Sequence, residues 1–511
     1  MKPEPDWAVH LPPGTDASTV DLAAGGTLPG ACTAAWRSDP SRITLSTLDG
    51  VAVSAGELEA RTADAAGRYA AAGLAPGDRL LLSAGTSVAT VVAYVGALRA
   101  GLTVVPANPG LTSVELAKLV ESAHPALAVL DNPNRLPPDS TATVMPDLDG
   151  LPGARTETAL DAADAADTAL IIYTSGTTGQ PKGVPLSHAN LLASAHAVRL
   201  AWRWTAEDNL ALCLPLFHVH GLGVGLHGTL VCGAQATLMP RFEPSAVAES
   251  IHKGSTLLFG VPTMYHKLAE SAWLAELAGL RLAVSGSAPL PAELHRAVRA
   301  ASGQSVLERY GMTETVMLVS NPYDGERRPG TVGFPLPGVE VRLAPREGGT
   351  AEIEVRGPNV ITGYLGTASA QVHTGPDARV ALNGAAFTDD GWFRTGDLGE
   401  FDDGGYLCIS GRTKELIITG GYNVYPREVE ELLRSHANVS DAAVVGAPSD
   451  RWGETVVAFV VCAGDPAGLV SELEAFAAAH LVAYKRPREW RVVDAIPRNA
   501  LGKILRHQLR P

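Results

Sequence analysis

The sequence predicts an α/β protein in which two smaller parts of different construction follow a large first part. In residues 58–309, short apolar runs alternate with helical patterns, as in parallel sheets covered by helices. From about Thr331, apolar and polar residues alternate with a period of two, which is typical of antiparallel strands. From about Glu415, strands and helices alternate again over a short distance, which predicts a compact α+β module.

The first part is expected to begin with a weakly patterned segment, residues 1–50, that is rich in Gly, Pro and Ala. Helices are expected at residues 58–72, 87–98 and 224–231 and from about Pro291, and a further helix, which Ser187 or Asn190 can cap, is expected to run to about Trp202. Strands are expected at residues 79–83, 102–105, 126–130, 210–214, 236–239, 256–259, 281–285 and 305–309, and in the run that begins at Thr168. Residues 133–163 are rich in Pro, Asp and Ala, which predicts a surface excursion.

A small β-rich subdomain is expected over about residues 331–411, as the last section of a large N-terminal domain that spans residues 1–411. Its strands are expected at residues 339–343, 351–355, 398–401 and 406–410, the last two joined by a hairpin turn. Residues 412–511 are expected to form a separate small domain. There, helices are expected at residues 426–434 and 469–481, and strands at residues 442–445 and 456–461.

Composition limits the class of protein. A chain of 511 residues predicts about two to four domains. Apolar residues make up 46% and charged residues 18%, so sizeable cores can form and the chain is not disordered as a whole. The net charge is −14 without a long basic run, so no nucleic-acid partner is expected. No apolar run of about 18 residues occurs, so no membrane span is expected.

The cysteines and the N-terminus predict a cytoplasmic protein. The N-terminus, MKPEPDWAVH, has no apolar core after a basic start, which argues against a secretory signal. The cysteines are scattered and show no C-x-x-C spacing, so a metal cage and a disulfide framework are both disfavoured and reduced thiols are expected. They are Cys32, Cys213, Cys232, Cys408 and Cys462.

The stretch TALIIYTSGTTGQPKG, residues 168–183, predicts a phosphate-binding loop. An apolar strand pattern changes abruptly into Ser, Thr and Gly, whose hydroxyl and backbone N–H groups are donors suited to phosphate oxygens. Lys182 adds a mobile positive charge. The spacing matches neither a Walker A loop nor a G-x-G-x-x-G dinucleotide loop. The stretch therefore predicts phosphate binding of another kind.

Several other expected strands end in loops of small residues. In an open α/β sheet, ligands bind beyond the carboxyl ends of the strands, so the loops at Ser175, His218, Gly286 and Tyr310 should surround one crevice. His218 and His220 have the spacing of half a metal site, but no further ligand is near in the sequence. One histidine that lines a pocket is the preferred interpretation. Lys503, beside a glycine in a terminal loop, could be inserted into this crevice.

Five separate motifs, in this order and spacing, resemble the AMP-forming acyl- and aryl-CoA synthetases, a superfamily that also holds nonribosomal adenylation domains and luciferases. The motifs are residues 173–183, YGMTET at 310–315, WFRTGD at 392–397, GRTKELIITGG at 411–421 and PRNALGK at 497–503. The resemblance covers nearly the whole chain beyond residue 30. FHVHG, SGSAPLP, ERYGMTET and SNPYDGERRPGTVGFPLPGVEVRL look most similar to malonyl-CoA synthetases and their short-chain relatives.

The resemblance implies a large N-terminal domain with layered αβαβα sheets and a mobile C-terminal domain. It also implies a two-step reaction with ATP, Mg²⁺ and coenzyme A. A small-molecule carboxylic acid first attacks the α-phosphorus of ATP, which gives an acyl-adenylate and pyrophosphate. The thiol of coenzyme A then displaces AMP. Such steps need positioning and charge stabilisation rather than a covalent nucleophile.

Catalytic roles follow from the matching residues. The resemblance implies that Glu314 ligates Mg²⁺ and that Thr313 contacts the α-phosphate. Lys503 would bridge the substrate carboxylate and the α-phosphate during adenylation, and His218 would either orient the carboxylate or simply pack. The β- and γ-phosphates would be held by the loop residues Thr174, Ser175, Gly176, Thr177, Thr178 and Lys182.

The nucleoside and hinge roles are also implied by the resemblance. Asp397 would hold both ribose hydroxyls, and Arg412 would add a ribose or phosphate contact. Lys414 lies at the hinge, where rotation would move Lys503 out and bring in the loop of Gly420 and Gly421, which lets a pantetheine arm pass. Adenine would lie between Tyr310 and the opposite wall, in a set of nucleotide-binding residues that comprises Tyr310, Gly311, Met312, Gly286, Ser287 and Ala288.

The acid itself stays open at this point. The implied acyl pocket is largely apolar, since its lining would be Val219, Gly223, Val261, Pro262, Met264, Gly286, Val316, Met317 and Leu318. A dicarboxylate such as malonate would need a cation for its second carboxylate. Arg241 and Arg281 are candidates for that cation. A larger apolar biosynthetic acid is the alternative.

The thiol acceptor also has alternatives. A carrier protein could replace free coenzyme A, although no carrier domain is fused to the chain. Lys485, Arg486 and Arg488 could meet the phosphates of the coenzyme or could simply form a solvated surface. A third possibility is an enzyme that performs mainly one half-reaction, although motif residues for both are present.

Overall fold

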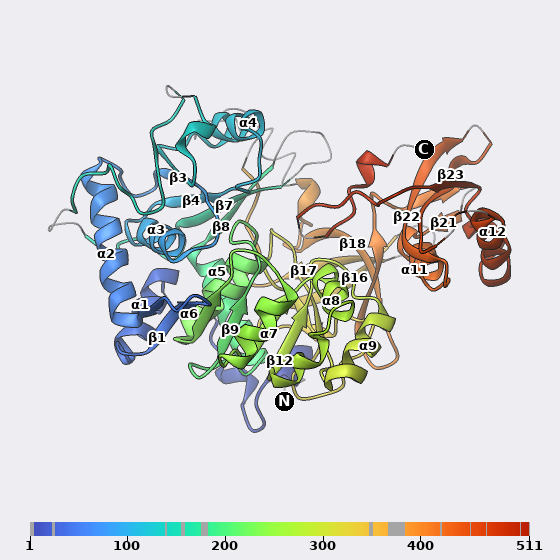
Figure 1. Ribbon diagram of the computed structural model, residues 1–511, viewed down its shortest axis with the longest axis horizontal. Coiled ribbons are helices and arrows are strands. Elements are labelled where there is room, and N and C mark those ends of the chain that lie inside the picture. Colours follow the sequence, from blue (N-terminus) through green and yellow to red (C-terminus); the bar gives the residue numbers. More distant parts are fainter. Residues whose placement is uncertain are drawn as a thin grey trace.

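The computed structural model describes residues 5–22, 26–137, 140–154, 159–174, 182–346, 351–365, 384–419, 422–449, 451–464, 466, 468–500 and 502–509. Two large sheets and their helices form the first part of the chain, and two smaller sheets follow (Figure 1). The second of these smaller sheets belongs to a lobe at one side of the molecule, with the C-terminus on it (Figure 1).

A six-stranded sheet carries the candidate phosphate loop. Its central strands pair in parallel, while β7 and β8 pair in antiparallel register and place Thr174 opposite Lys182. The order is β6 (Thr143–Val144), β5 (Leu127–Leu130), β3 (Arg79–Ser83), β4 (Thr103–Pro106), β7 (Thr168–Thr174) and β8 (Lys182–Ser187). The loop between β7 and β8 lies outside the described residues except at its two ends.

A nine-stranded sheet follows. The six inner strands of this sheet, β13, β12, β11, β9, β10 and β1, run parallel to one another. The outer strands β14, β15 and β2 pair in antiparallel register. The carboxyl ends of β9, β11, β12 and β13 therefore meet at one edge of the sheet. The order is β15 (Phe334–Pro335), β14 (Val319–Ser320), β13 (Leu307–Tyr310), β12 (Leu282–Ser285), β11 (Leu257–Gly260), β9 (Asn209–Leu212), β10 (Gln235–Leu238), β1 (Ile43–Thr47) and β2 (Ala52–Ser54).

The helices and sheets alternate in five layers, because successive strand residues face opposite sides. Leu80 and Leu82 belong to a core that joins both sheets to the helices between them, whereas Leu81 packs with the outer helix α4. On the other sheet, Leu258 likewise faces an outer core with α7, α8 and α9. The inner helices are α1 (Leu28–Ser38), α2 (Ala55–Ala71), α3 (Val88–Arg99), α5 (His188–Ala201) and α6 (His227–Cys232); the outer ones are α4 (Ser113–Ala123), α7 (Pro244–His252), α8 (Pro262–Ala269) and α9 (Ala292–Ser302).

The two smaller sheets are mainly antiparallel. The first consists of β16 (Glu340–Pro345), β17 (Ala351–Arg356), β18 (Phe393–Phe401) and β19 (Leu407–Arg412). The second has its own apolar core and consists of β20 (Ile417–Thr419), β21 (Tyr422–Val424), β22 (Val439–Ser449), β23 (Gly453–Cys462) and β24 (Glu489–Val492), covered by α11 (Pro426–Arg434) and α12 (Leu469–His480). Short 3₁₀ turns occupy Asp6–His10, Ala17–Thr19, Pro133–Arg135, Leu274–Gly279, Ala483–Lys485 and Arg506–Gln508.

The α/β class, the layering and most expected elements are confirmed. The strand 79–83 and the helix 426–434 have the expected bounds, and Ser187 caps α5 as expected. The helices that the sequence missed are α1, α4, α7 and α8, and the strands that it missed are β1, β2, β6, β8, β14, β15, β20, β21 and β24. In residues 1–50, α1 begins at a true cap, because the Thr27 hydroxyl accepts from the Gly30 N–H, but Gly, Pro and Ala obscured its period.

The helix expected at 224–231 is instead a π-helical stretch, His220–Leu226, that continues into α6. Its glycines allow a close approach to the neighbouring chain. A Cβ at Gly221 would lie 2.3 Å from the Pro215 oxygen, and one at Gly228 would lie 2.2 Å from the Trp204 ring. π-Helical segments often occur at functional sites, and this one follows β9 at the sheet edge where the strand ends meet.

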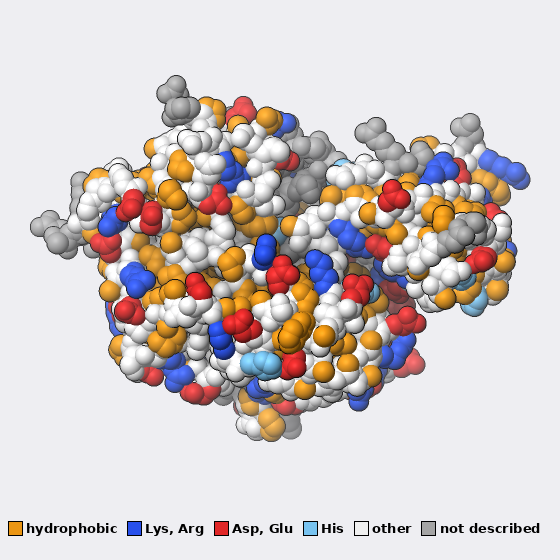
Figure 2. All heavy atoms as spheres, viewed as in Figure 1, with side chains coloured by type: hydrophobic (Ala, Val, Ile, Leu, Met, Phe, Trp, Pro, Cys, Tyr) orange, Lys and Arg blue, Asp and Glu red, His pale blue; other side chains and the backbone are white. Residues whose placement is uncertain are grey.

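In the described part of the chain, no helix is long and apolar enough to cross a membrane. On the face shown in Figure 2, Lys and Arg side chains alternate with Asp and Glu side chains over the large part and the lobe. All five cysteines are free thiols, as expected from their scatter.

Candidate active site

The carboxyl ends of the parallel strands bring three of the expected loops together. His220, after β9, has its Nδ1 3.2 Å from the Oγ of Ser287, after β12. Val316, in the loop after β13, lies close to the loop after β9, because a Cβ at Gly223 would lie 3.2 Å from Val316 Cγ1. The structure thus brings the His218, Gly286 and Tyr310 loops together, while Ser175 lies outside the described residues.

At one side of this crevice, the buried carboxylate of Asp397 is bound by Arg412 and Tyr310. It lies on β18 directly opposite Arg412 on β19, and Arg412 Nε is 2.9 Å from its Oδ1. The Tyr310 hydroxyl donates to Oδ2 at 2.5 Å. The Asp397 carboxylate raises the pKa of Arg412, and burial together with that carboxylate holds the pKa of Tyr310 well above its usual value. A carboxylate has about four acceptor positions, so ribose hydroxyls can still share it.

Glu314 is the centre of a second part. It is buried, and burial raises the pKa of its carboxyl group. The Tyr364 hydroxyl donates to Glu314 Oε1 at 2.9 Å, and Lys182 Nζ lies 5.4 Å from the centre of the Tyr364 ring. The structure thus brings the lysine after the candidate phosphate loop to the same place as the candidate metal ligand.

These residues could bind Mg²⁺ only if the phosphates of a substrate supply further ligands. Among the described residues, no group of three or more His, Cys, Asp or Glu could hold a metal ion. Mg²⁺ is commonly bound by one or two carboxylates together with substrate phosphates. Glu314, buried at the strand ends beside Lys182, suits that arrangement, because a nearby cation would offset the cost of keeping its carboxylate charged.

The wall opposite Tyr310 has a constrained backbone. Ser287 has φ +67°, an uncommon conformation for a residue with a side chain, and it turns its hydroxyl towards His220. Gly286 has no room for a Cβ, which would lie 2.4 Å from the Arg309 guanidinium. Ala288 completes this turn. Across the crevice, Met312 and Thr313 are half-buried after Gly311, and Val316 has φ +56°.

A cluster of buried polar groups without partners lies under this wall. The Arg309 side chain is buried, and neither its Nε nor its Nη2 has a hydrogen-bond partner. His220 Nε2 and Ser285 Oγ are also buried and unpaired. Burial lowers the pKa of Arg309 to about 9, so the guanidinium stays charged at neutral pH. Burial and the Arg309 charge hold the pKa of His220 well below its usual value.

His218 is less central than expected. Its half-buried ring packs at a tilt on Phe217, with 4.6 Å between the ring centres, and burial lowers its pKa to about 4. The neighbouring His220, not His218, contacts the Gly286–Ala288 turn. At neutral pH both histidines are uncharged and can serve as hydrogen-bond partners.

The two arginines first considered as a second anion site do not occupy the cluster. Arg281 makes two hydrogen bonds to Asp208, at 2.9 and 2.8 Å, at the opposite ends of the strands. Arg241 is exposed and lies 3.4 Å from Glu243. Arg309, which the sequence reasoning overlooked, is instead the buried cation without an anionic partner.

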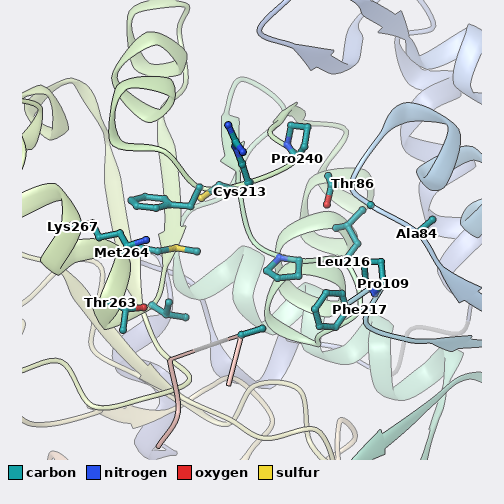
Figure 3. A pocket seen from close by; sticks show the side chains of 16 residues that line it. Ala84, Thr86, Pro109, Cys213, Leu216, Phe217, Pro240, Thr263, Met264 and Lys267 are labelled. Carbon is teal, nitrogen blue, oxygen red and sulfur yellow. The ribbon is translucent and has the colours of Figure 1, made fainter. Parts of the chain in front are cut away.

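A cavity of about 370 Å³ opens beside the crevice (Figure 3). Met264 and Lys267 of α8 face Leu216 and Phe217 across it, and Thr86 comes from the other large sheet. Arg241 lies at its rim, and Ala500 of the C-terminal loop closes one side. The cavity is mainly apolar and has cations at its edge.

The loop of Lys503, in the small C-terminal domain, lies near this crevice. The Lys503 side chain is exposed to solvent, but crowding by protein atoms and the Arg412 charge lower its pKa. Gly502 touches α8, since a Cβ there would lie 2.8 Å from Thr263 Cγ2. Lys414 is exposed in the turn after β19.

The remaining predicted site residues lie at the ends of the described ranges or outside them. Thr174 ends β7 and Lys182 begins β8. Ser175, Gly176, Thr177, Thr178, Gly420 and Gly421 lie outside the described residues. Sequence reasoning missed Arg309, Ser285 and Tyr364, and it considered His220 only together with His218, as half a metal site. Arg309 had a signal, because a charged residue stands inside a buried strand pattern.

The sequence matches two families of known proteins. Residues 32–365 match the AMP-binding enzymes, and residues 428–503 match the C-terminal domain of AMP-binding enzymes. A sulfoacetate–CoA ligase of Cupriavidus necator is 36% identical over 93% of this chain and 95% of its own length. The alignments span only 61% of a probable CoA ligase of Humulus lupulus (36% identical) and 64% of a mitochondrial malonate–CoA ligase of Xenopus laevis (38% identical), each over 67% of this chain.

Solved structures agree with these matches. ATP-bound MatB from Rhodopseudomonas palustris is 36% identical and superposes with a TM-score of 0.84, over 94% of this chain and 98% of that chain. A malonyl-CoA ligase in a ternary product complex with methylmalonyl-CoA and AMP is 42% identical, but its TM-score is 0.64, over 90% of this chain and 97% of that chain. The more similar sequence therefore has the less similar overall arrangement.

The Tyr364→Phe variant should weaken the binding of ATP with Mg²⁺ about tenfold or more and leave Mg²⁺-free ATP binding unchanged. The phenol oxygen orients the Glu314 carboxylate, and its loss removes one charge-assisted hydrogen bond, worth about 1.5–3 kcal/mol. Calorimetric titration with and without EDTA measures both. Tyr69→Phe removes a buried tyrosine hydroxyl elsewhere and serves as the control. Equal loss under both conditions would contradict a role through the metal.

The Asp397→Asn variant should raise the dissociation constant of AMP by about tenfold, since it removes the charge that aligns Arg412 and Tyr310. Fluorescence or calorimetric titration measures the constant. Asp208→Asn is the matched control, because it breaks a buried bidentate pair with Arg281 at the opposite sheet edge. AMP affinity that falls equally in both variants would indicate a general structural effect.

Proposed function

Because the chain belongs to the AMP-binding enzyme family, we propose that it joins a small carboxylic acid bearing a second anionic group to coenzyme A, with conversion of ATP to AMP and pyrophosphate. In the first step, an oxygen of the carboxylate bonds to the α-phosphorus of ATP, and the bond to pyrophosphate breaks. In the second step, the sulfur of coenzyme A bonds to the acyl carbon, AMP leaves, and the thiol proton passes to solvent. The enzyme is thus an acid–thiol ligase.

The observation that carries the choice of acid is the unpaired charge of Arg309. A buried cation without an anion costs several kcal/mol, and nothing among the described residues compensates it. A carboxylate or sulfonate on the acid would supply the missing partner and the acceptors for Nε and Nη2. His220 Nε2 and Ser285 Oγ lie in the same cluster and could complete its hydrogen bonds.

The relatives support this choice without deciding it. Sulfoacetate and malonate, named for two of the relatives, each carry an anionic group besides the reacting carboxylate. Another relative, 32% identical over 86% of this chain, is a long-chain-fatty-acid–CoA ligase of Bacillus subtilis. An apolar acid would suit the apolar lining near Val316, but it would leave Arg309 buried and unpaired. The charged cluster therefore favours the small dianionic acid.

Residues of two domains would share the adenylation step. Lys182 and Thr174 would hold the outgoing pyrophosphate, while Asp397 would hold the ribose, with Tyr310 beside the adenine. Lys503 would bridge the carboxylate and the α-phosphate as charge moves between them. Glu314 would hold Mg²⁺, which when bound neutralises part of the phosphate charge.

The apolar cavity beside Thr263 supports an access route for the pantetheine arm of coenzyme A, with Arg241 and Lys267 near its rim for phosphates. The basic residues of the small domain are less suitable. Lys485 pairs with Glu428 at 2.6 Å, and Arg486 donates to the Leu481 and Ala478 carbonyls. A carrier-protein thiol remains the alternative acceptor. Free cysteines and nucleotide substrates support action in the cytoplasm.

The second step would require rotation of the small domain, residues 412–511, about Lys414. The charge of Arg412 acts on Lys503, and the overall arrangement resembles the ATP-bound relative more than the product complex, which supports a start from the adenylation form. A rotated form would move Lys503 away and bring in the loop of Gly420 and Gly421. Hinge motions of this kind need only a few residues to change φ and ψ.

A panel of acids, read by ATP–pyrophosphate exchange and by mass spectrometry of the CoA product, tests the proposal. Malonate and sulfoacetate should exceed propionate, which has the three carbons of malonate but only one carboxylate, by about 100-fold or more in kcat/KM, since a buried charge pair is worth about 2–5 kcal/mol. The Arg309→Met variant should lose this preference while its melting temperature stays equal or rises.

Arg241→Ala is the matched control in the exchange assay, because this exposed arginine lies outside the cluster. Preference for propionate or decanoate over malonate in the wild-type chain would contradict the small dianionic acid. Loss of folding in Arg309→Met, seen by circular dichroism, would show that the charge serves stability instead.

The Lys414→Pro variant should slow thioester formation far more than adenylation. Proline fixes φ near −65° and restricts Thr413 to extended conformations, which limits rotation at the turn after β19. Pyrophosphate exchange measures the first step, and transfer from purified acyl-adenylate to coenzyme A measures the second. Asp403→Pro, in the exposed β18–β19 turn, controls for the introduction of a proline. Equal slowing of both steps would contradict a hinge at Lys414.

A further inference from the structure

We propose that Arg498 and Asp441 form a brace that positions the Lys503 loop, and that the adenylation step alone depends on this brace. The inference rests on the proposed function, in which Lys503 acts in adenylation. Neither residue touches the substrate in this proposal; both act through the backbone that carries Lys503.

The loop itself is a tight hairpin with few contacts of its own. Arg498 and Ile504 form an isolated antiparallel bridge. The Lys503 N–H donates to Asn499 Oδ1 and the Asn499 N–H donates to the Lys503 carbonyl, both at 2.9 Å. The Gly502 N–H donates to the Asn499 carbonyl at 2.9 Å. All of these bonds lie within the hairpin, so they fix its shape and not its orientation.

Arg498 supplies the orientation. Its Nη2 donates to both carboxylate oxygens of Asp441, at 2.9 and 2.8 Å, and its Nη1 donates to the Gly502 carbonyl at 2.6 Å. Asp441 lies near the start of β22, an outer strand of the small domain's sheet, opposite Val461 of β23. One planar guanidinium thus connects the residue before Lys503 to this strand. The three rotatable donors of a lysine could not do this equally well.

The braced loop meets the large domain at α8. Gly502 has φ +75° and lies against Thr263 without space for a Cβ. Burial lowers the pKa of His266 on the same helix, while the neighbouring charges of Glu270 and Asp441 raise it and those of Arg434 and Arg498 lower it. The Arg498–Asp441 pair therefore lies at the contact between the two domains, next to the point where Lys503 enters the crevice.

The Arg498–Asp441 pair should contribute little to the stability of the fold but much to the rate of adenylation. Arg498 and Asp441 are about a quarter exposed, and a partly exposed ion pair is typically worth about 0–1 kcal/mol of stability. A misplacement of about 1 Å can nevertheless lower a rate about 100-fold. Both residues belong to the small domain, so the brace moves with that domain. Once Lys503 has left the crevice, the thioester step has no need of it.

Two variants with small changes test the brace in the full-length chain, Asp441→Asn and Arg498→Lys. ATP–pyrophosphate exchange with the preferred acid should fall about 10- to 100-fold, mainly in kcat. Transfer of the acyl group from purified acyl-adenylate to coenzyme A should stay within about twofold of wild type. The double variant should lose no more than the worse single variant, because both remove one interaction.

Glu428→Gln is the matched control, since it breaks the Lys485 ion pair of the same domain away from Lys503. It should leave both half-reactions unchanged. Equal loss of both half-reactions in Asp441→Asn, or full exchange activity in both brace variants, would overturn the proposal.

Amide hydrogen exchange gives a measurement that needs no substrate. Protection of the Gly502 and Lys503 amides should fall in both brace variants and stay unchanged in Glu428→Gln. Loss of this protection together with an inactive wild-type chain would refute the proposed function and support the brace. Unchanged protection would overturn the brace even if the wild-type chain is active.

Discussion

The buried carboxylate of Asp397 holds together the parts of the chain on which the site depends. Its two oxygens contact Tyr310, at the end of a strand in the nine-stranded sheet, and Arg412, at the last residue of the small antiparallel sheet. Arg412 leads directly into the turn of Lys414 and the small domain. One anion therefore connects a sheet edge, a second sheet and the turn at Lys414, and it does so where the nucleotide is expected to bind.

The same edge of the nine-stranded sheet carries buried charged groups that do not stabilise the fold. A core tolerates Asp397 because Arg412 and Tyr310 satisfy it, but Arg309, one residue before Tyr310, has no such partner. The glycine at 286 and the left-handed backbone at Ser287 leave just enough space for the guanidinium. Unpaired charge and an unusual backbone conformation at adjacent positions are costs that a binding site can explain and a structural core cannot.

The sequence predicted the layers well because period-two and helical patterns report burial directly. It missed α1 and β1, where Gly, Pro and Ala weaken the pattern, and β8, because pairing with β7 is a non-local event. The motif residues were found from their order along the chain. Tyr364 was not, because a tyrosine that orients Glu314 is defined by its three-dimensional neighbours. Arg309 stands out as a charged residue in a buried strand pattern, but its lack of a partner becomes visible only in three dimensions.

Charge also couples the small domain to its substrates. Crowding by protein atoms and the charge of Arg412 lower the pKa of Lys503, although its side chain keeps contact with solvent. In the proposed adenylation form, these two positive charges would carry an electrostatic cost when no anion is bound. Phosphates and a dianionic acid between Lys503, Arg412 and Arg309 would reverse that cost, so their binding would favour closure. After pyrophosphate leaves, part of the negative charge is gone, and the same repulsion would favour departure of Lys503 and the rotation that thioester formation needs.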